Sequence, residues 1–310
     1  MGDERPLSFC NFSPDSKLLA IGSLSGTCKL FSVPECQEVR TLRGHDARVG
    51  SVVFHPQSRL SLSEDSVNLA SGAADGRLFL WSLTQDIPIA ELRPQLTPPG
   101  PTAPRICRVA FHPSGRYIGS TSMDSLWRFW DVTTEKELLY QEGHHKEAPA
   151  NGVYAIAFHP HGALAATGGF DHIGRLWDLR IGKSIMVLEG HTKPVLGVDF
   201  PAYGYHLATA SDDNTVKLWD IRNRKCLFTI PAHSGLVSNV KFQPEKADFL
   251  LTCSYDKAAR LWSTHDWTLL RPLVGHSNYV MHADIAPDSS FIATCSYDRT
   301  FRLWSYERFA

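Results

Sequence analysis

Short apolar runs separated by turn-forming residues recur along the whole chain. Residues 153–191 contain four in succession, "VYAIAF", "ALAATGG", "GRLWDLR" and "KSIMVLEG". Each run is about four to eight residues long, rich in β-branched and aromatic residues, and bounded by Gly, Asp or Pro, a pattern that predicts strands rather than helices. Apolar side chains stand on both faces of such runs, as at Phe301, Leu303 and Trp304. We therefore expect an all-β chain whose sheets are covered on both sides.

The runs belong to a unit that is repeated seven times. An aromatic residue before Asp or Ser marks each copy, and successive marks lie 50, 49, 47, 42, 43 and 42 residues apart. These anchors are Phe31, Trp81, Trp130, Trp177, Trp219, Trp262 and Trp304. One four-stranded copy cannot bury both of its faces alone, and seven copies of this period can stack into a closed ring. We expect residues 1–310 to form a single ring of seven four-stranded antiparallel sheets.

Polar residues recur at fixed distances before the anchors. Asp stands six residues before six of the anchors, and Ser or Thr stands ten residues before six of them. A Gly-His pair, or Ala-His in one copy, opens five of the units. A buried indole N–H is costly without an acceptor, which gives these polar residues a structural use.

These motifs resemble those of the WD-repeat family, whose fold is the β-propeller, and the resemblance covers essentially the whole chain. It implies that each Trp donates to Ser or Thr, which bonds to His, which the turn Asp holds. Five such chains are expected: His45, Ser71, Asp75 and Trp81; His144, Thr167, Asp171 and Trp177; His191, Thr209, Asp213 and Trp219; His233, Thr252, Asp256 and Trp262; and His276, Thr294, Asp298 and Trp304.

Two units depart from this pattern. The unit ending at Trp130 keeps Ser120 and Asp124, but "ELRPQL" replaces its Gly-His pair. The unit ending at Phe31 has neither His nor Asp at the expected offsets. Phe has no N–H to satisfy, so the missing polar partners fit the missing donor.

Two insertions lengthen the repeat. They are "QSRLSLSEDSVN" at 57–68 and the proline-rich "RPQLTPPGPTAPR" at 93–105. Proline cannot donate in a sheet interior, and long connections run over the surface, so we expect two surface loops.

The last unit stops six residues after its anchor. The tail 306–310 is too short to turn and return as a fourth strand, and residues 1–6 include Gly2, three charges and Pro6, which has no N–H. We therefore expect an incomplete last blade. In the resembled family further regions precede the propeller, and we expect them to be absent from this chain.

Composition and charge narrow the function classes. The chain has 31 basic and 32 acidic residues, which argues against a general nucleic-acid or anionic-membrane binder. No apolar run approaches the ~20 residues that span a bilayer, and the start has no secretory pattern. The seven cysteines form no C-x-x-C pair, which favours reduced thiols in a cytosolic or nuclear protein.

The recurring Ser/Thr, His and Asp do not indicate catalysis. A hydrolase needs one exposed nucleophile and an oxyanion hole, and it does not repeat its triad around a ring. No residues show zinc-ligand spacing, and "ATGGFDHIG" stands between two strands, whereas a phosphate loop needs a strand and then a helix. We expect no catalytic residue, no metal, no cofactor and no small-molecule substrate.

The surface supplies the candidate binding residues. In propellers of the resembled family, the residue before the turn Asp and residues after Gly-His point to one rim. The first set is Leu24, Ala74, Met123, Phe170, Asp212, Tyr255 and Tyr297, and the second includes Arg48, Lys193 and Tyr279. Exposed aromatic and large apolar residues favour partner binding. We expect a partner-binding rim of Arg48, Met123, Phe170, Lys193, Tyr255, Tyr279 and Tyr297; packing against neighbouring loops is the alternative for each.

The amino-acid sequences of the repeats are similar to those of the WD-repeat proteins of the spliceosomal U4/U6 small nuclear ribonucleoprotein. The quoted stretches are "LRGHDARVGSVVFHP", "GVYAIAFHPHGALAATGGFDHIGRLWDLR" and "IATCSYDRTFRLW". The resemblance implies a nuclear, non-catalytic scaffold in pre-mRNA splicing. Its partners would be splicing factors of the U4/U6 and tri-snRNP particles, with local contact to U4/U6 RNA and none to membranes. A substrate-recognition propeller of a ubiquitin ligase and a signalling scaffold remain the alternatives.

Overall fold

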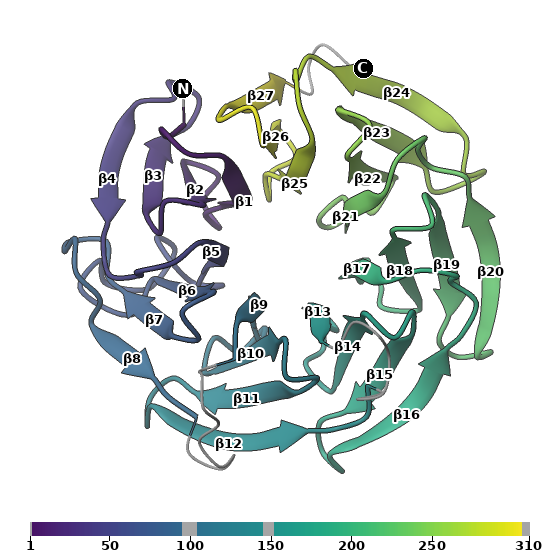
Figure 1. Cartoon of the computed structure of the whole chain (residues 1–310), viewed down its shortest axis with the longest axis horizontal. Coiled ribbons are helices and arrows are strands. Elements are labelled where there is room, and N and C mark those ends of the chain that lie inside the picture. The colour runs from purple at the N-terminus through teal and green to yellow at the C-terminus, as the bar shows by residue number, and fades with distance from the viewer. Residues whose placement is uncertain (1, 95–103, 145–151, 306–310) are drawn as a thin grey trace.

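The computed structural model describes residues 2–94, 104–144 and 152–305. Its strands form seven antiparallel sheets arranged in a ring around a central axis, as Figure 1 shows. The predicted seven-bladed β-propeller is confirmed. We number the sheets as blades 1 to 7 in chain order.

The first four blades each contain four strands. Blade 1 has β1 (Leu7–Phe12), β2 (Leu18–Ser23), β3 (Cys28–Ser32) and β4 (Glu38–Leu42), and blade 2 has β5 (Val49–Phe54), β6 (Leu69–Ala73), β7 (Leu78–Trp81) and β8 (Ala90–Leu92). Blade 3 has β9 (Ile106–Phe111), β10 (Tyr117–Ser122), β11 (Trp127–Asp131) and β12 (Lys136–Gln141), and blade 4 has β13 (Val153–Phe158), β14 (Leu164–Gly169), β15 (Gly174–Asp178) and β16 (Lys183–Leu188).

Blades 5 and 6 also have four strands, and blade 7 has three in the described residues. Blade 5 has β17 (Val195–Asp199), β18 (His206–Ser211), β19 (Val216–Asp220) and β20 (Lys225–Ile230), and blade 6 has β21 (Val237–Phe242), β22 (Phe249–Ser254), β23 (Ala258–Ser263) and β24 (Leu269–Val274). Blade 7 has β25 (Val280–Ile285), β26 (Phe291–Ser296) and β27 (Phe301–Ser305). The expected shorter last blade agrees with these three strands; the tail 306–310 lies outside the described residues.

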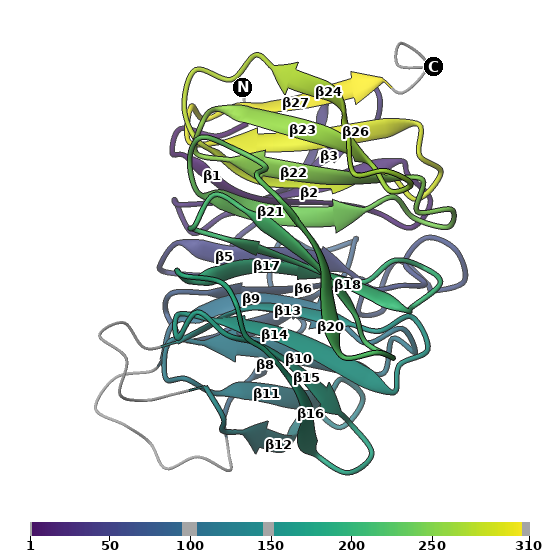
Figure 2. The same ribbon diagram turned by 90° about the vertical axis from the view of Figure 1, so that its right-hand side faces the viewer.

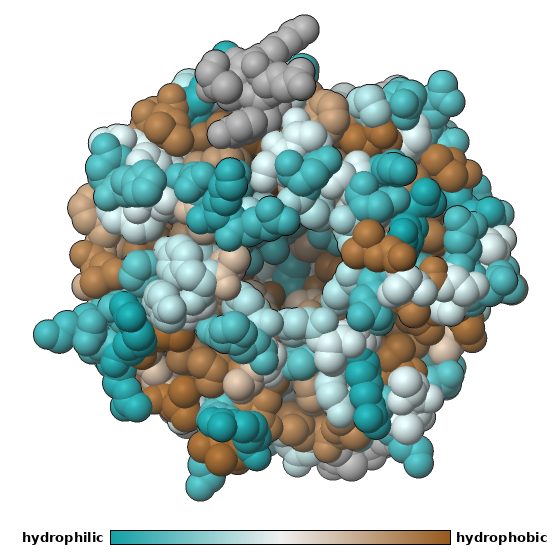
Figure 3. All heavy atoms as spheres, turned by 180° about the vertical axis from the view of Figure 1, so that it is seen from behind, coloured by the Kyte–Doolittle hydropathy of each residue, from teal (hydrophilic) through white to brown (hydrophobic). Residues whose placement is uncertain are grey.

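Each blade meanders outward from the axis. Its strands pair in chain order, so that the first lines the axis and the fourth forms the circumference (Figure 1). Figure 2 shows the sheets edge-on, and Figure 3 shows the reverse face, hollowed at its centre. Of the two predicted surface loops, 57–68 connects β5 to β6 and is mostly exposed. Most of the other, 95–103, lies outside the described residues.

The hydrophobic core is divided among the seams between blades. Seven clusters of buried apolar residues occur, and each combines residues of two adjacent blades, as the cluster of Leu188 and Val198 with the anchor Trp219 joins blades 4 and 5. The ring therefore depends on every seam, because each sheet buries its two faces against different neighbours.

Hydrogen bonds of polar side chains on the inner strands reinforce three blade junctions, 5/6, 7/1 and 1/2. Asn11 of blade 1 accepts the backbone N–H of Phe54 in blade 2 at 2.8 Å. Asp199 accepts that of Phe242 at 2.7 Å, and Asp284 accepts that of Phe12 at 2.9 Å. Burial raises the pKa of both aspartates, although Lys241 partly offsets this effect. The Ser8 hydroxyl also donates to the carbonyl of Val49 across the junction of blades 1 and 2.

A different interaction joins blades 2, 3, 4 and 5 just after the last residues of their inner strands. In each "FHP" motif the His Nδ1 accepts a backbone N–H two residues on, at 3.1 Å, so Nε2 carries the proton. His112 Nε2 donates to the carbonyl of Gly162 at 2.8 Å, and His159 Nε2 to that of Gly204 at 3.1 Å. His55 packs in the same way on Gly115, where an added Cβ would lie 2.2 Å from Nε2.

The glycines that contact these histidines should not tolerate a side chain, and Gly115 can be compared with a glycine that has no such contact. Gly115 has a φ of +75°, and Gly182, in an outer turn with φ +63°, has only the flexible end of Gln141 nearby. Gly182→Ala should cost about 1 kcal/mol for its left-handed backbone. Gly115→Ala should cost about 3 kcal/mol or more because it also displaces His55. Urea denaturation of the two variants measures the difference, and equal losses would contradict the His–Gly interaction.

Candidate functional site

In five blades a continuous hydrogen-bond chain joins Trp, Ser or Thr, His and Asp. In blade 5, Trp219 Nε1 donates to Thr209 Oγ1 at 2.9 Å, Thr209 lies 2.8 Å from His191 Nε2, and His191 Nδ1 lies 2.8 Å from Asp213. The same links, between 2.7 and 3.0 Å, join the expected residues ending at Trp81, Trp177, Trp262 and Trp304.

The chemistry of these groups fixes the direction of every bond. An ionised Asp can only accept, so the facing Nδ1 of His must carry the proton. The neutral Nε2 then accepts from the hydroxyl, whose oxygen accepts the indole N–H. Each of these hydroxyls is fully buried, so solvent does not reach its oxygen.

Each of these five aspartates also accepts a backbone N–H of its turn, and in four of them the oxygen that does so is not the one bonded to His. Asp75 Oδ1 accepts the backbone N–H of Arg77 at 2.9 Å, and Asp213 Oδ1 accepts that of Thr215 at 3.0 Å. The residue after the Asp position adopts a left-handed backbone in all seven blades, at Gly26, Gly76, Ser125, His172, Asn214, Lys257 and Arg299. The carboxylate thus holds both the buried chain and the exposed turn.

The hydrogen bonds perturb the acidity of these groups. Burial alone would raise the pKa of Asp75, but hydrogen bonds from His45 and from the backbone N–H of Arg77 lower it to about 2. Burial would likewise raise the pKa of Asp298, but hydrogen bonds from Thr300 and His276 lower it to about 2. Both carboxylates therefore stay ionised under ordinary conditions.

Burial lowers the pKa of several histidines. In His233 and His276 it outweighs the hydrogen bond to the turn aspartate, which acts in the opposite direction. In His55 and His159 burial also lowers the pKa against a backbone hydrogen bond. The folded protein thus holds these imidazoles in the neutral form.

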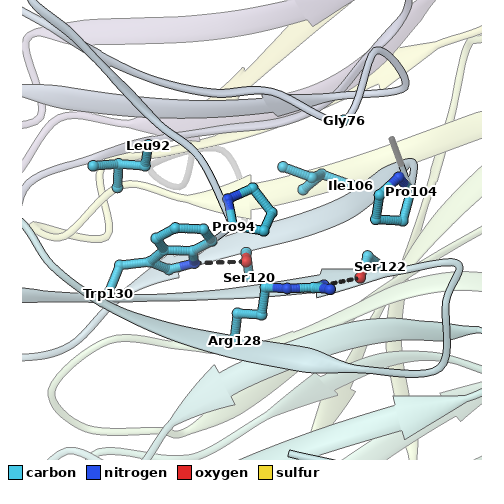
Figure 4. Close-up of a pocket in the computed structure, with 9 residues that line it drawn as sticks. All are labelled: Gly76, Leu92, Pro94, Pro104, Ile106, Ser120, Ser122, Arg128 and Trp130. Atoms are coloured by element: carbon cyan, nitrogen blue, oxygen red, sulfur yellow. Dashed lines mark hydrogen bonds between the residues drawn. The ribbon is translucent and has the colours of Figure 1, made fainter. Parts of the chain in front are cut away.

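Blade 3 has lost its histidine but keeps part of the network. Trp130 Nε1 still donates to Ser120 Oγ at 2.8 Å. Asp124 accepts from Arg128, a buried side chain that also donates to Ser122 (Figure 4). A cavity of about 10 Å³ lies beside Trp130, lined in part by Pro94 and Pro104, close to the volume that one water needs.

In blade 1 an acidic residue stands where five other blades have histidine. The Asp3 carboxylate accepts from the hydroxyl of Ser25 at 2.5 Å and from that of Thr27 at 3.4 Å. The expectation that this unit lacks a partner acid was wrong. The sequence could have revealed Asp3. Gly2 lies five residues before Leu7, the first residue of β1, just as Gly44 of the Gly-His pair lies five residues before Val49 in blade 2.

The rim is built from two equivalent positions in each blade. The backbone N–H of the residue before the turn Asp donates to the carbonyl of the residue before the first strand, at 2.9 to 3.1 Å. These pairs are Leu24–Pro6, Ala74–Arg48, Met123–Arg105, Phe170–Gly152, Asp212–Pro194, Tyr255–Leu236 and Tyr297–Tyr279. The same backbone hydrogen bond therefore occurs in every blade, although the side chains at these positions differ from blade to blade.

The structure brings three of the expected rim residues together. The rings of Tyr255 and Tyr279 stack 4.5 Å apart, and Tyr297 lies 6.3 Å from Tyr279. Tyr279 and Tyr297 are 42% and 43% exposed, so this cluster presents aromatic surface to solvent. Burial raises the pKa of Tyr255 to about 12.

The other expected rim residues lie in separate settings. Phe170 packs edge-on against Tyr154 at 5.8 Å and is half-buried, as is Met123. Arg48 is exposed, and Lys193 pairs with Asp212 at 3.8 Å. The expected rim is thus one aromatic cluster on blades 6 and 7 plus scattered positions on blades 2 to 5.

Sequence reasoning missed Arg108, which lines a central cavity of about 80 Å³ together with Asn239 and His282 of other blades. The Arg108 guanidinium lies 4.5 Å from the ring centre of Tyr154 and 5.2 Å from that of Phe9, and it donates to the carbonyl of Gly50. The signal was a lone Arg within the apolar inner strand "ICRVAF".

The cysteines, possible metal ligands and possible membrane helices complete the description. All seven cysteines are free. Among the described residues, no group of three or more His, Cys, Asp or Glu side chains could hold a metal ion. The described part of the chain contains no helix long and apolar enough to cross a membrane.

Comparison with known families agrees with the seven blades. The family described as WD domain, G-beta repeat matches residues 2–32, 36–82, 92–131, 136–178, 182–220, 224–263 and 267–305. Each match ends at the third strand of one blade, close to its anchor.

Individual relatives are similar over shorter stretches. A Bos taurus protein named U4/U6 small nuclear ribonucleoprotein Prp4 is 58% identical over 24% of this chain and 14% of its own length. The Saccharomyces cerevisiae protein named U4/U6 small nuclear ribonucleoprotein PRP4 is 34% identical over 45% of this chain and 28% of its own. A Caenorhabditis elegans protein named Pre-mRNA-processing factor 19 is 29% identical over 38% and 21%. The matched segments are thus less than a third of each relative.

The buried hydroxyl of each chain should matter mainly through the Trp it serves. In blade 6, Thr252→Val leaves the Trp262 indole N–H without an acceptor and should cost about 1–3 kcal/mol. Blade 1 has Ile21 and Phe31 at these two positions. In a double-mutant cycle with Trp262→Phe, the combined loss should therefore be about 1 kcal/mol smaller than the sum of the single losses. Full additivity by urea denaturation would contradict the bond.

The lowered histidine pKa values predict weaker folding in mild acid. His55, His159, His233 and His276 bind protons less readily when folded than when unfolded. The unfolded state therefore takes up more protons once the pH falls below about 6.5, and stability present at pH 7 is lost toward pH 5. Urea denaturation across this range measures the loss. A constant free energy of unfolding between pH 7 and pH 5 would contradict it.

Proposed function

Because the chain belongs to the WD domain, G-beta repeat family, we propose that it is a non-catalytic protein-interaction scaffold of the U4/U6 small nuclear ribonucleoprotein and the tri-snRNP. It acts in pre-mRNA splicing and works in the nucleus. Relatives named for that particle support the proposal, since they match from mammals to yeast. A plant relative, PRP4-like protein of Arabidopsis thaliana, is 46% identical over 26% of the chain.

The observation that carries the interaction role is the tyrosine cluster of blades 6 and 7. Tyr255 stacks on Tyr279, and Tyr297 lies tilted against Tyr279, so the three side chains support one another before a partner arrives. Tyrosine gives a large contact area for little lost conformational freedom, which suits a binding hot spot. The Lys193–Asp212 pair and Arg48 provide polar positions elsewhere on the rim.

Splicing-factor proteins of the U4/U6 and tri-snRNP particles are the partners of this rim. The nearly balanced charge of the chain suits a protein that holds other proteins and touches U4/U6 RNA only locally. The buried hydrogen-bond chains support the rim from below through the turn aspartates. Their geometry offers no exposed nucleophile, in keeping with a non-catalytic role.

Affinity purification of the tagged protein from nuclear extract tests the proposal. U4 and U6 RNAs and tri-snRNP proteins should be enriched, as measured by RNA sequencing and mass spectrometry. Tyr279→Ala with Tyr297→Ala should reduce the recovered partner proteins by about tenfold or more, because it removes the exposed aromatic surface. Tyr205→Ala, which removes a tyrosine 51% exposed in the β17–β18 turn, should leave recovery unchanged.

Two results would overturn the proposal. Recovery of ubiquitin-ligase or signalling proteins without U4 and U6 RNAs would assign the propeller to another pathway. Equal recovery with the rim variant and the Tyr205→Ala control would remove the tyrosine cluster as the binding surface.

A further inference from the structure

The outer strands β20 and β24 turn apolar side chains toward each other across the seam of blades 5 and 6. Phe228 pairs opposite Leu218, whose cluster faces blade 6. Leu269 pairs opposite Trp262, which belongs to the same cluster and faces blade 5. Pro272 and Val274 share the face of Leu269 through their pairing with Arg260 and Ala258. We call Phe228, Leu269, Pro272 and Val274 the outer patch; β20 and β24 lie on the circumference in Figure 1.

The outer patch is exposed and apolar, whereas most of the equivalent residues named here from other blades are buried or polar. Phe228 is 43% exposed, whereas Met186, at the same position in blade 4, is 8% exposed. Leu269 is 46% exposed, and its counterparts opposite the anchors are Glu38, Glu137, Ser184 and Cys226. Val274 is 71% exposed, and the residues before the other Gly-His or Ala-His pairs are Arg43, Glu142, Glu189 and Pro231. The fold does not require apolar residues there.

A free cation flanks the outer patch. Lys225 pairs opposite Asp220, on the same face of blade 5 as Phe228, and is exposed. Asp220 accepts bonds from Arg222 and Asn223 instead, and Lys225 has no ion pair among the residues the structure describes. An occupant of the patch is therefore favoured by a carboxylate near this end.

The size and the backbone of the patch limit how it can be covered. The exposed fractions leave roughly 300 Å² of apolar surface, less than half of the ~800 Å² per partner of a stable dimer. Pro272 offers no N–H on the edge strand β24, which disfavours an added strand. A short segment that binds through its side chains fits better, and an amphipathic helix presents apolar groups at such spacing.

We propose that the outer patch binds a short acidic amphipathic helix of a partner protein. The site is separate from the rim, which occupies the turns between second and third strands, and it would let the scaffold hold two partners at once. The apolar stripe of the helix covers Phe228, Leu269 and Val274, and an acidic residue of the helix pairs with Lys225.

Selection of 16-residue peptides from a display library against the protein tests the site. Enriched peptides should carry apolar residues at i, i+3 or i+4 and i+7 with acidic residues beside them. Leu269→Glu with Val274→Glu should weaken their dissociation constant by about tenfold or more. The fold accepts Glu at both positions, as Glu38 and Glu189 show in other blades. Lys225→Glu should weaken binding by about threefold or more.

The matched control is Val39→Glu, which changes a valine 54% exposed on β4 of blade 1. It should leave binding of the selected peptides within about twofold, because single scattered surface residues contribute little. The rim variant Tyr279→Ala with Tyr297→Ala should also leave it unchanged, which separates failure of this site from failure of the rim.

Each other result overturns the proposal. No enriched peptide, basic peptides, or peptides insensitive to Leu269→Glu with Val274→Glu would show that the patch is not this site. Concentration-dependent dimerisation in sedimentation experiments, abolished by the same double variant, would make the occupant a second copy of the chain.

Discussion

The carboxylate of the turn aspartate links the interior of this protein to its binding surface. One oxygen accepts the backbone N–H that closes the turn, and the other accepts the His proton that begins the buried chain to Trp. The same group therefore sets the left-handed turn, the imidazole tautomer and the position of the anchor indole. Because the group is shared, the rim cannot shift without disturbing bonds that are shielded from water, where they are strongest.

The seams between blades make the rim rigid by two different means. Across junctions 5/6, 7/1 and 1/2, polar side chains of the inner strands accept backbone N–H groups, and across 6/7 Ser238 and Asn239 donate to backbone carbonyls. From blade 2 to blade 5, histidines donate to glycine carbonyls, and those glycines have no room for a Cβ. A ring closed in this way presents a preformed surface, so partners lose less free energy to ordering it.

The sequence allowed the repeat, the anchors and the five complete chains to be predicted, because their residues recur at fixed offsets. Prediction failed in the two blades where a residue other than histidine takes the place of the histidine found in the other five. Asp3 occupies a histidine position, and Arg128 replaces the missing histidine of blade 3 from a neighbouring strand. Arg108 was missed because its partners Phe9 and Tyr154 come from other blades. Such contacts depend on ring closure, which no local pattern encodes.

The left-handed residue of the turns is glycine in only two of the seven blades. Ser, His, Asn, Lys and Arg occupy the others, so the turn accepts side chains of very different size, from the buried Ser125 to the exposed Lys257 and Arg299. The aspartate before it makes the geometry independent of what its neighbours carry. The rim is consequently modular: the residues on either side of an aspartate can be exchanged while the blade beneath it stays the same.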